Sequence, residues 1–396
     1  MQTIKHTRHL KFLAKVGLLL AICSSCALAQ DQIQVQAKTQ APQSTNTVSS
    51  DSDAAAYPDV DAALGEALYP NEEELAQAIG LDIEKFIHKT YSPGNARRDA
   101  HPKSHGCVQA ELHIMDSIPK ELAQGIFIPD KTYKAWIRFS NGSKDPSHAD
   151  IEKDARGMAI KVLGVPGEKL LDNEHEATTQ DFIMISHPVF FANDPQRYLS
   201  FVNKLNSESF FQKLLIPFAL GFKGTKIVWQ TLRTTIANPL QTRYWSTVPY
   251  QLGNGPARQA VKYSARPCSA NKDAIPKHPE HNYLRAAMRS TLENGDACME
   301  LLVQPRTSDS MSVEDSMTEW KESKAPFYPV ATLRIPQQTF DTIEQNQFCE
   351  NLSFNPWHAL PAHKPLGVTN RLRKVIYDRI SRVRHEMNSA LRQEPN

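Results

Sequence analysis

A tyrosine flanked by arginines near the C-terminus is the most chemically suggestive pattern in this chain. Tyr377 has Arg373 four positions before it and Arg384 seven positions after it. On a helix that turns by about 100° per residue, both arginines fall within roughly 40° of the tyrosine, beside an apolar stripe. Cations on this face stabilise a phenolate, so the pattern indicates a tyrosine that can bind a metal ion as an anion. The alternative is an amphipathic basic helix whose tyrosine only packs.

Other polar residues of chemical interest precede this segment. Arg98 and His101 lie three positions apart in a predicted loop, just before a segment with the alternation of a strand. Residues 133–140 form a second predicted strand, and a period of two places Arg138 and Ser140 on one face of it. A predicted strand over 157–163 and the segment 187–194 follow.

The elements that must position these residues are a mixture of helices and antiparallel strands. Apolar periodicity predicts a helix over residues 72–89 and a helical region over 195–238. Alternating or apolar runs predict strands over 107–114, 133–140, 157–163, 181–186, 298–304 and 330–335. Hairpin and long-loop connections outnumber βαβ units, so we expect an α+β fold around an antiparallel sheet or barrel.

The N-terminal region has the features of an export signal. Residues 1–29 contain basic residues, an apolar run over 16–23 and the motif Ala27-Leu28-Ala29, which predicts cleavage before Gln30. Cys23 and Cys26 leave a lipoprotein as an alternative. Residues 30–56 are polar and predict a disordered linker, and residues 57–396 predict a single domain. We therefore expect a periplasmic or secreted protein.

Charge and cysteine content narrow the functional class. The 396 residues carry a formal net charge of +2 with dispersed basic residues, which argues against binding to nucleic acid. The mature chain keeps four cysteines: Cys107, Cys268, Cys298 and Cys349. In an oxidising compartment they can form up to two disulfides in any of three pairings, or some can remain as buried thiols.

Taken in order, these segments resemble the haem catalase family, and among its members the short secreted catalase-like proteins. The matching patterns are R-x-x-H-x-K-x-x-G at 98–106, R-F-S at 138–140, D-x-R-G-x-A-x-K at 154–161, P-x-F-F-x-x-D at 188–194 and R-x-x-x-Y at 373–377. Phe354-Asn355-Pro356 is similar to the family's F-D-P turn. The resemblance implies a β-barrel core with surrounding helices, bound haem, a peroxide substrate and a homo-oligomer.

The resemblance also implies roles for individual residues. His101 would be the distal base that moves a proton between the two oxygens of a peroxide, and Ser140 would orient its ring. Tyr377 would be the proximal iron ligand, an arrangement that haem catalases share, with Arg373 stabilising its phenolate.

Five further positions would hold the porphyrin. Arg98, Arg138 and Arg384 would pair with the haem propionates, because arginine binds carboxylates in a bidentate manner. Phe190 and Tyr198 would line the haem pocket with their rings.

One departure from the family pattern affects the expected reaction. The position of the family's distal asparagine is occupied here by Ile185, which has no amide to guide hydrogen peroxide. We therefore expect a peroxidase or an enzyme that converts organic hydroperoxides, such as those of fatty acids. The alternatives are a true catalase that dismutates hydrogen peroxide, a haem-binding protein without turnover, and an interaction module without haem.

Two remaining features are assigned structural roles. The apolar stretch 210–222 is too short to span a bilayer, and a buried helix or a subunit interface is favoured over an entrance for lipid hydroperoxides. The histidines at 278, 281, 358 and 363 lie in proline-rich loops whose spacing fits no complete metal site.

Overall fold

The computed structural model describes residues 57–171, 174, 176–270, 272–392 and 395. The predicted signal peptide and linker, residues 1–56, lie outside the described residues. Within the described part of the chain, no helix is both long and apolar enough to cross a bilayer.

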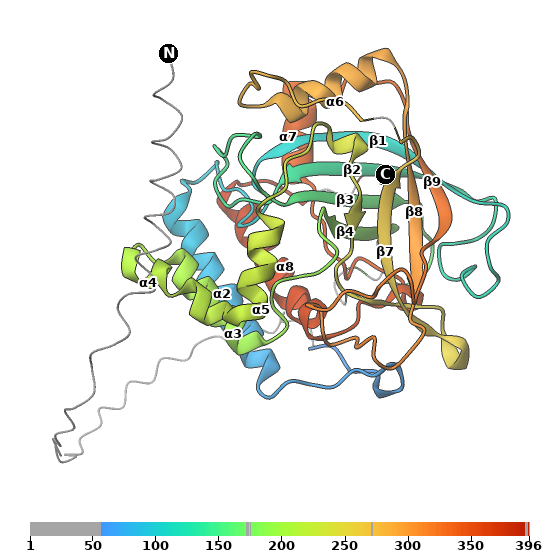
Figure 1. Cartoon of the computed structure of the whole chain (residues 1–396), viewed down its shortest axis with the longest axis horizontal. Coiled ribbons are helices and arrows are strands. Elements are labelled where there is room, and N and C mark those ends of the chain that lie inside the picture. Colours follow the sequence, from blue (N-terminus) through green and yellow to red (C-terminus); the bar gives the residue numbers. More distant parts are fainter. Residues whose placement is uncertain (1–56, 172–173, 175, 271, 393–394, 396) are drawn as a thin grey trace, which may run out of the picture. The chain divides into compact units, whose positions relative to one another are not determined.

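The centre of the molecule is a closed antiparallel β-barrel (Figure 1). Its strands follow the order β5-β4-β3-β2-β1-β9-β8-β7, and pairing of β5 with β7 closes the ring of eight, while β6 pairs with β7 outside it. The bounds are β1 (Ser104–Ile114), β2 (Thr132–Asn141), β3 (Arg156–Leu163), β4 (Thr179–Ile185), β5 (Tyr244–Trp245), β6 (Tyr250–Leu252), β7 (Gln259–Pro267), β8 (Ala297–Pro305) and β9 (Tyr328–Ile335). The predicted α+β barrel is confirmed.

Strand sequence explains the barrel's packed interior. In β1, Val108, Ala110, Leu112 and Ile114 are buried while Gln109 and Glu111 are exposed, the alternation expected of a strand with one face in a core. Side chains of the same kind from the other strands join them in one apolar cluster. Because this interior is filled, a ligand site must lie outside the barrel wall.

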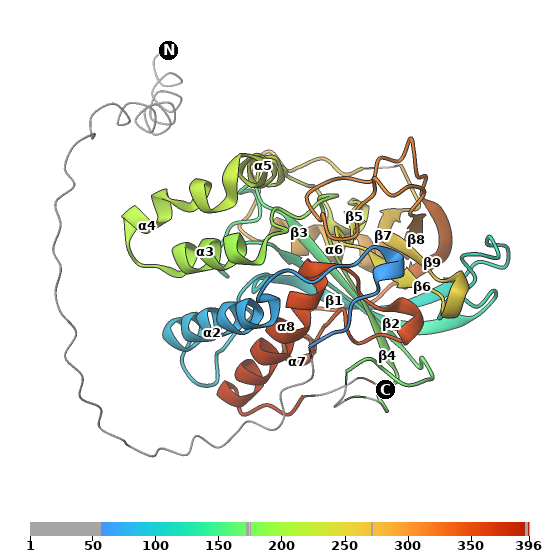
Figure 2. The same cartoon turned by 90° about the horizontal axis from the view of Figure 1, so that it is seen from below.

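The helices over residues 72–90, 195–231 and 368–387 gather on one side of the barrel and form the helical group (Figure 2), whereas those over 283–294 and 343–351 pack against β1. Their bounds are α2 (Glu72–Thr90), α3 (Pro195–Asn206), α4 (Phe210–Leu214), α5 (Ile216–Thr231), α6 (Tyr283–Asn294), α7 (Ile343–Asn351) and α8 (Val368–Met387), with short 3-10 turns η1 (Ala62–Leu64), η2 (Pro239–Gln241), η3 (Gly255–Ala257) and η4 (Pro361–His363). A second apolar cluster joins α2, α3 and α8 through Ile79, Ile83, Val202, Leu372 and Ile376.

The helical region predicted over 195–238 is correct only in part. Helices α3, α4 and α5 cover it as far as Thr231, but residues 232–238 are not helical. Gly221 interrupts α5 with a φ of 67° and a ψ of 178°. For residues 210–222 a buried helix or a subunit interface was expected. The buried helix is contradicted, because Phe210, Phe211 and Phe222 are exposed, and the subunit interface stays a prediction.

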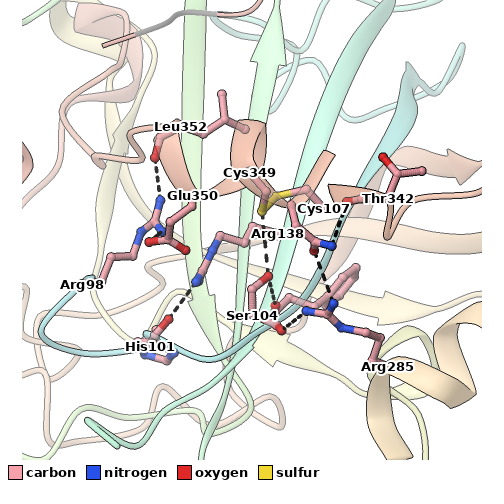
Figure 3. The surroundings of a disulfide bond; sticks show 12 residues. Arg98, His101, Ser104, Cys107, Arg138, Arg285, Thr342, Cys349, Glu350 and Leu352 are labelled. Atoms are coloured by element: carbon pink, nitrogen blue, oxygen red, sulfur yellow. Dashed lines mark hydrogen bonds and ion pairs between the residues drawn. A yellow bond between two sulfur atoms is a disulfide. The ribbon is translucent and has the colours of Figure 1, made fainter. Parts of the chain in front are cut away.

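The structure also selects one of the three cysteine pairings. Cys107 on β1 is joined to Cys349 on α7, and Cys268, just after β7, is joined to Cys298 on β8. The first disulfide therefore attaches α7 to the barrel beside the loop that carries His101 (Figure 3).

Candidate active site

A cavity of about 780 Å³ lies between the barrel wall and the helical group. All nine residues that the sequence singled out line it: Arg98, His101, Arg138, Ser140, Phe190, Tyr198, Arg373, Tyr377 and Arg384. They come from the loop before β1, from β2, from the segment around α3 and from α8. The structure brings the predicted residues together, while their chemical roles remain predictions.

His101 is held on the barrel side of the cavity by two hydrogen bonds. Its Nδ1 lies 3.0 Å from Oγ of Ser140, and its carbonyl oxygen accepts a 2.8 Å hydrogen bond from the guanidinium of Arg138. Its backbone has a φ of 62°, a conformation that few residues other than glycine adopt. The contacts that impose this backbone also fix the direction of the imidazole.

The surroundings of His101 keep its imidazole neutral. Burial lowers the pKa of His101 to about 4, and the nearby charge of Arg138 acts in the same direction. A neutral imidazole can accept a proton, so the ring can serve as a base over the whole physiological pH range.

Gly157 makes room for the His101 and Ser140 pair. This glycine on β3 is paired with Ser140 on β2. A Cβ at position 157 would lie 2.5 Å from Nδ1 of His101 and 2.7 Å from Oγ of Ser140, closer than real contacts allow. The glycine in the D-x-R-G segment therefore has a steric reason to be there.

The helix α8 also lines the cavity, together with an aromatic group. The guanidinium of Arg373 lies 5.4 Å from the centre of the Phe190 ring. That ring contacts Phe191 at 4.4 Å and Tyr198 at 6.0 Å between centroids. Tyr377, one turn after Arg373, also lines the cavity. This wall therefore offers a phenol next to flat apolar rings.

Arg98 and Arg138 lie beside the carboxylate of Glu350 at an edge of the site (Figure 3), and Arg384 approaches the same carboxylate. Arg98 donates 2.8 Å and 2.5 Å hydrogen bonds to Glu350 Oε1 and to the carbonyl of Leu352. Arg384 also donates to the Leu352 carbonyl, at 3.2 Å, and lies 3.8 Å from Glu350 Oε1. Burial raises the pKa of Glu350, but the charges of Arg98, Arg138 and Arg384 outweigh it and lower that pKa.

The arginine group has more positive charge than Glu350 can balance. Burial lowers the pKa of Arg384 to about 9, and repulsion from Arg98 adds to this effect. The pKa of Arg138 is lowered for the same two reasons, burial and repulsion from Arg98. Within the described residues, Nε of Arg138 is buried without a hydrogen-bond partner. A ligand bearing two carboxylates fits this edge, because it would balance the remaining charge and offer acceptors to the arginines.

The donor set as a whole is compatible with haem. The cavity combines a phenol, a neutral imidazole, aromatic rings and an arginine edge suited to carboxylates. These are the groups that a tyrosine-ligated porphyrin requires. The residues present therefore fit the cofactor that the sequence resemblance implied.

The similarity of this chain to known proteins lies in its structure. No family model matches the sequence, and no curated protein matches it. Among solved structures, a fungal catalase matches with a TM-score of 0.59 and 18% identity over 76% of this chain and 61% of that protein. Catalase A from Saccharomyces cerevisiae gives 0.55 and 18% over 76% and 63%. A bacterial catalase gives 0.60 and 17% over 90% and 71%.

The chain has a catalase-like fold. It spans about three fifths of the length of the fungal and yeast catalases that it matches. At this level of identity the comparison concerns the fold, so the chemistry must be argued from the cavity.

Sequence reasoning missed several residues of the site. Glu350 at the arginine edge had no motif to mark it, since its position depends on α7 and the Cys107–Cys349 disulfide. Asp99 and Lys144 form a 2.7 Å ion pair at the cavity wall. Ile185 does line the cavity, at the end of β4, as its sequence position suggested.

The histidines at 358 and 363 lie in the core and make hydrogen bonds there. His363 accepts a 3.0 Å hydrogen bond at Nε2 from the backbone of Ile126 and has Tyr263 2.8 Å from Nδ1. His358 lies 2.7 Å from Asp181 and 2.9 Å from Glu174. Both therefore have partners that account for their burial.

Proposed function

We propose that this protein is an exported haem-dependent oxidoreductase that decomposes peroxides. The observation that carries the proposal is the single cavity onto which the His101–Ser140 pair, the arginine edge and Tyr377 all open. Tyr377 would hold the iron, and Arg98, Arg138 and Arg384 would hold the propionates. Bound haem would supply the redox-active iron at which the O–O bond of a peroxide is cleaved.

The residues of the chain supply proton transfer and orientation. The neutral imidazole of His101 takes the proton of the peroxide oxygen and returns it to the leaving oxygen. The hydroxyl of Ser140, 3.0 Å from Nδ1, keeps the ring in the required direction. The rings of Phe190 and Tyr198 keep the reacting region apolar.

The apolar distal wall favours organic hydroperoxides over hydrogen peroxide. Ile183, Met184 and Ile185 line the cavity from β4, and Val228 and Leu232 line it from α5 and the residue after it. A carbon chain can pack against these side chains, while hydrogen peroxide finds no amide at position 185. Efficient dismutation of hydrogen peroxide is the alternative activity.

The deciding experiment separates cofactor binding from turnover. The purified mature chain is reconstituted with one equivalent of haem, and its visible spectrum is compared with that of Tyr377→Phe. A high-spin ferric spectrum that is lost in the variant supports ligation by Tyr377, and an unchanged spectrum contradicts it. Loss of hydrogen peroxide and of a fatty-acid hydroperoxide is then followed in wild type and His101→Ala.

Two outcomes would replace the proposal. If wild type binds haem but neither peroxide is consumed, the protein is a haem-binding protein without turnover. If wild type and Ile185→Asn evolve oxygen from hydrogen peroxide equally fast, and faster than either converts the fatty-acid hydroperoxide, true catalase activity is the better assignment.

Export is part of the proposal. Two disulfides, one of them joining residues 242 positions apart, are typical of proteins that fold in an oxidising compartment. They support the predicted signal at residues 1–29. Fractionation of cells that produce the full chain tests this, and retention in the reducing cytosol would contradict it.

A further inference from the structure

Helices α4 and α5 present an exposed aromatic surface. Five aromatic side chains define what we call the α4–α5 surface: Phe210 is 69% exposed, Phe211 77%, Phe218 75%, Phe222 89% and Trp229 58%. They lie within 20 consecutive residues, and the exposed Leu214, Leu215 and Leu232 extend the same segment. Single exposed apolar residues are ordinary, but a group of this size marks a surface that contacts another phase or molecule.

The backbone of α5 explains why these rings point outward. Gly221 adopts a φ of 67° and divides α5 into two short helices, with Phe218 before the break and Phe222 after it. The other side of the same segment is packed, since Ala219, Leu220 and Ile227 are buried. The outward rings are therefore held by a folded element and are not the exposed end of a loose loop.

The charge of the segment is entirely basic. Between Ser209 and Lys272 the sequence has no aspartate or glutamate. Lys213, Lys226 and Arg233 are exposed, whereas Lys223 pairs with Asp315 at 3.2 Å. The preceding acidic residue, Glu208, pairs with Lys89 at 2.5 Å. Aromatic side chains interspersed with exposed cations are the composition of a surface that rests in an anionic lipid headgroup layer.

A second copy of this chain fits the surface less well. A twofold contact places the same patch on both partners, so it would bring Lys213, Lys226 and Arg233 of one copy against those of the other. The segment has no acidic residue to balance them. An anionic bilayer supplies both the apolar layer for the rings and the negative charge for the cations.

We propose that the α4–α5 surface docks this protein on anionic membranes. Helix α5 also lines the large cavity through Ile216, Val228 and Thr231, and Leu232 follows it. Docking would therefore place a wall of the cavity next to the lipid phase. If the proposed peroxide chemistry holds, the surface selects acyl-chain hydroperoxides of membrane lipids as substrates, and this last step rests on the proposed function.

The test measures binding to vesicles without any reaction. The purified mature chain is sedimented with vesicles of phosphatidylcholine alone and with vesicles containing phosphatidylglycerol. We expect binding to the anionic vesicles that weakens with added salt. Phe218→Ser/Phe222→Ser should lower the partition coefficient by about tenfold or more, since it removes the two most outward rings of α5.

Matched controls keep the result interpretable. Ile343, 72% exposed on α7, lies outside the segment, so Ile343→Ser should bind like wild type. Lys213→Glu/Lys226→Glu should lose the preference for anionic vesicles while the rings remain. Circular dichroism checks that each variant is folded.

Several results would overturn the proposal. The first is absence of binding to the anionic vesicles. The second is unchanged vesicle binding by Phe218→Ser/Phe222→Ser. The third is a concentration-dependent dimer of wild type that this double variant abolishes. Because binding is measured without haem or peroxide, it can succeed where the proposed reaction fails. A chain that binds vesicles but consumes no lipid hydroperoxide keeps the docking surface and loses only the proposed substrate.

Discussion

At the scale of single residues, His101 controls the pH range in which the proposed chemistry can operate. Its pKa is lowered from 6.5 to about 4, chiefly by burial, so the neutral base predominates above that value. We expect kcat/KM for peroxide consumption by the reconstituted protein to fall in acid with a midpoint near pH 4. A midpoint near 6.5 would show that the imidazole is solvated during turnover. Circular dichroism at each pH separates titration from unfolding.

The space at Gly157 gives a second residue-scale prediction. Gly157→Ala inserts a Cβ between His101 and Ser140, so we expect peroxide turnover to fall by at least about tenfold and stability by about 1–3 kcal/mol. Gly295→Ala is the matched control, because a Cβ there meets nothing within 4 Å. Turnover assays and urea unfolding of both variants check this. Equal effects of the two substitutions would refute the steric argument.

The sequence was sufficient to find nine residues that line the cavity but not all of its charges. Tyr377, Arg373 and Arg384 could be placed on one face because helical spacing is regular. Glu350 could not, since its approach to Arg98 depends on how α7 is attached to β1. A buried carboxylate without a motif is visible only once its partners are known.

At the scale of elements, a buried ion network fixes α8 against the rest of the molecule. The guanidinium of Arg371 is bound by Glu66 and Glu72 at 2.7 Å and by Glu314 at 3.0 Å. Removing it leaves three carboxylates near one another, so Arg371→Ala should cost about 3–5 kcal/mol. Arg379→Ala, on the same helix but partly exposed, should cost about 1 kcal/mol or less. Denaturant unfolding of both variants tests the difference.

The two disulfides should contribute unequally to stability. The Cys107–Cys349 bond joins residues 242 positions apart, against 30 for Cys268–Cys298. Loop-closure entropy then predicts a loss of up to about 5 kcal/mol for Cys107→Ser/Cys349→Ser and about 3–4 kcal/mol for Cys268→Ser/Cys298→Ser. The first variant should also bind haem more weakly, because Glu350 follows Cys349. Thermal unfolding measures the loss of stability, and haem titration measures the loss of binding. A larger loss of stability in Cys268→Ser/Cys298→Ser would contradict the loop-closure argument.

Element prediction succeeded where periodicity was strong and failed where tertiary packing decided the outcome. Alternation in β1 and the apolar stripe of α2 were sufficient for their approximate bounds. The break at Gly221 and the exposure of Phe222 were not visible, because an apolar run has the same composition whether it is buried or exposed. That ambiguity concealed the surface that we propose as a docking site.

At the scale of the whole molecule, the barrel and the helical group supply different residues of the cavity. The barrel interior is filled with apolar side chains, so it provides a rigid wall that carries His101, Arg138 and Ser140. The helices supply the other wall, including Tyr377, and the exposed α4–α5 surface. Antiparallel strands could be predicted from local patterns, whereas the closure of β5 on β7 joins two short segments that carry little pattern of their own.

Buried neutral histidines should make the whole fold sensitive to acid. Burial lowers the pKa of His105 and of His363 to about 3 and that of His101 to about 4. Unfolded histidines titrate near 6.5, so below that pH the unfolded chain binds more protons and the folded state loses stability as pH falls toward 4. With three such groups the loss approaches about 4 kcal/mol per pH unit between roughly pH 6 and 4.5.

A single substitution isolates one third of this effect. In His363→Gln, the amide oxygen can accept the hydrogen bond from the Ile126 backbone that Nε2 accepts in wild type, but the side chain has no proton to gain. We expect the variant to be somewhat less stable than wild type at pH 7 because Tyr263 loses its 2.8 Å partner. Its stability should then fall less steeply in acid, by about 1.4 kcal/mol per pH unit. Urea unfolding at pH 7, 6 and 5 measures both slopes, and parallel slopes would mean that His363 is not the group that takes up the proton on unfolding.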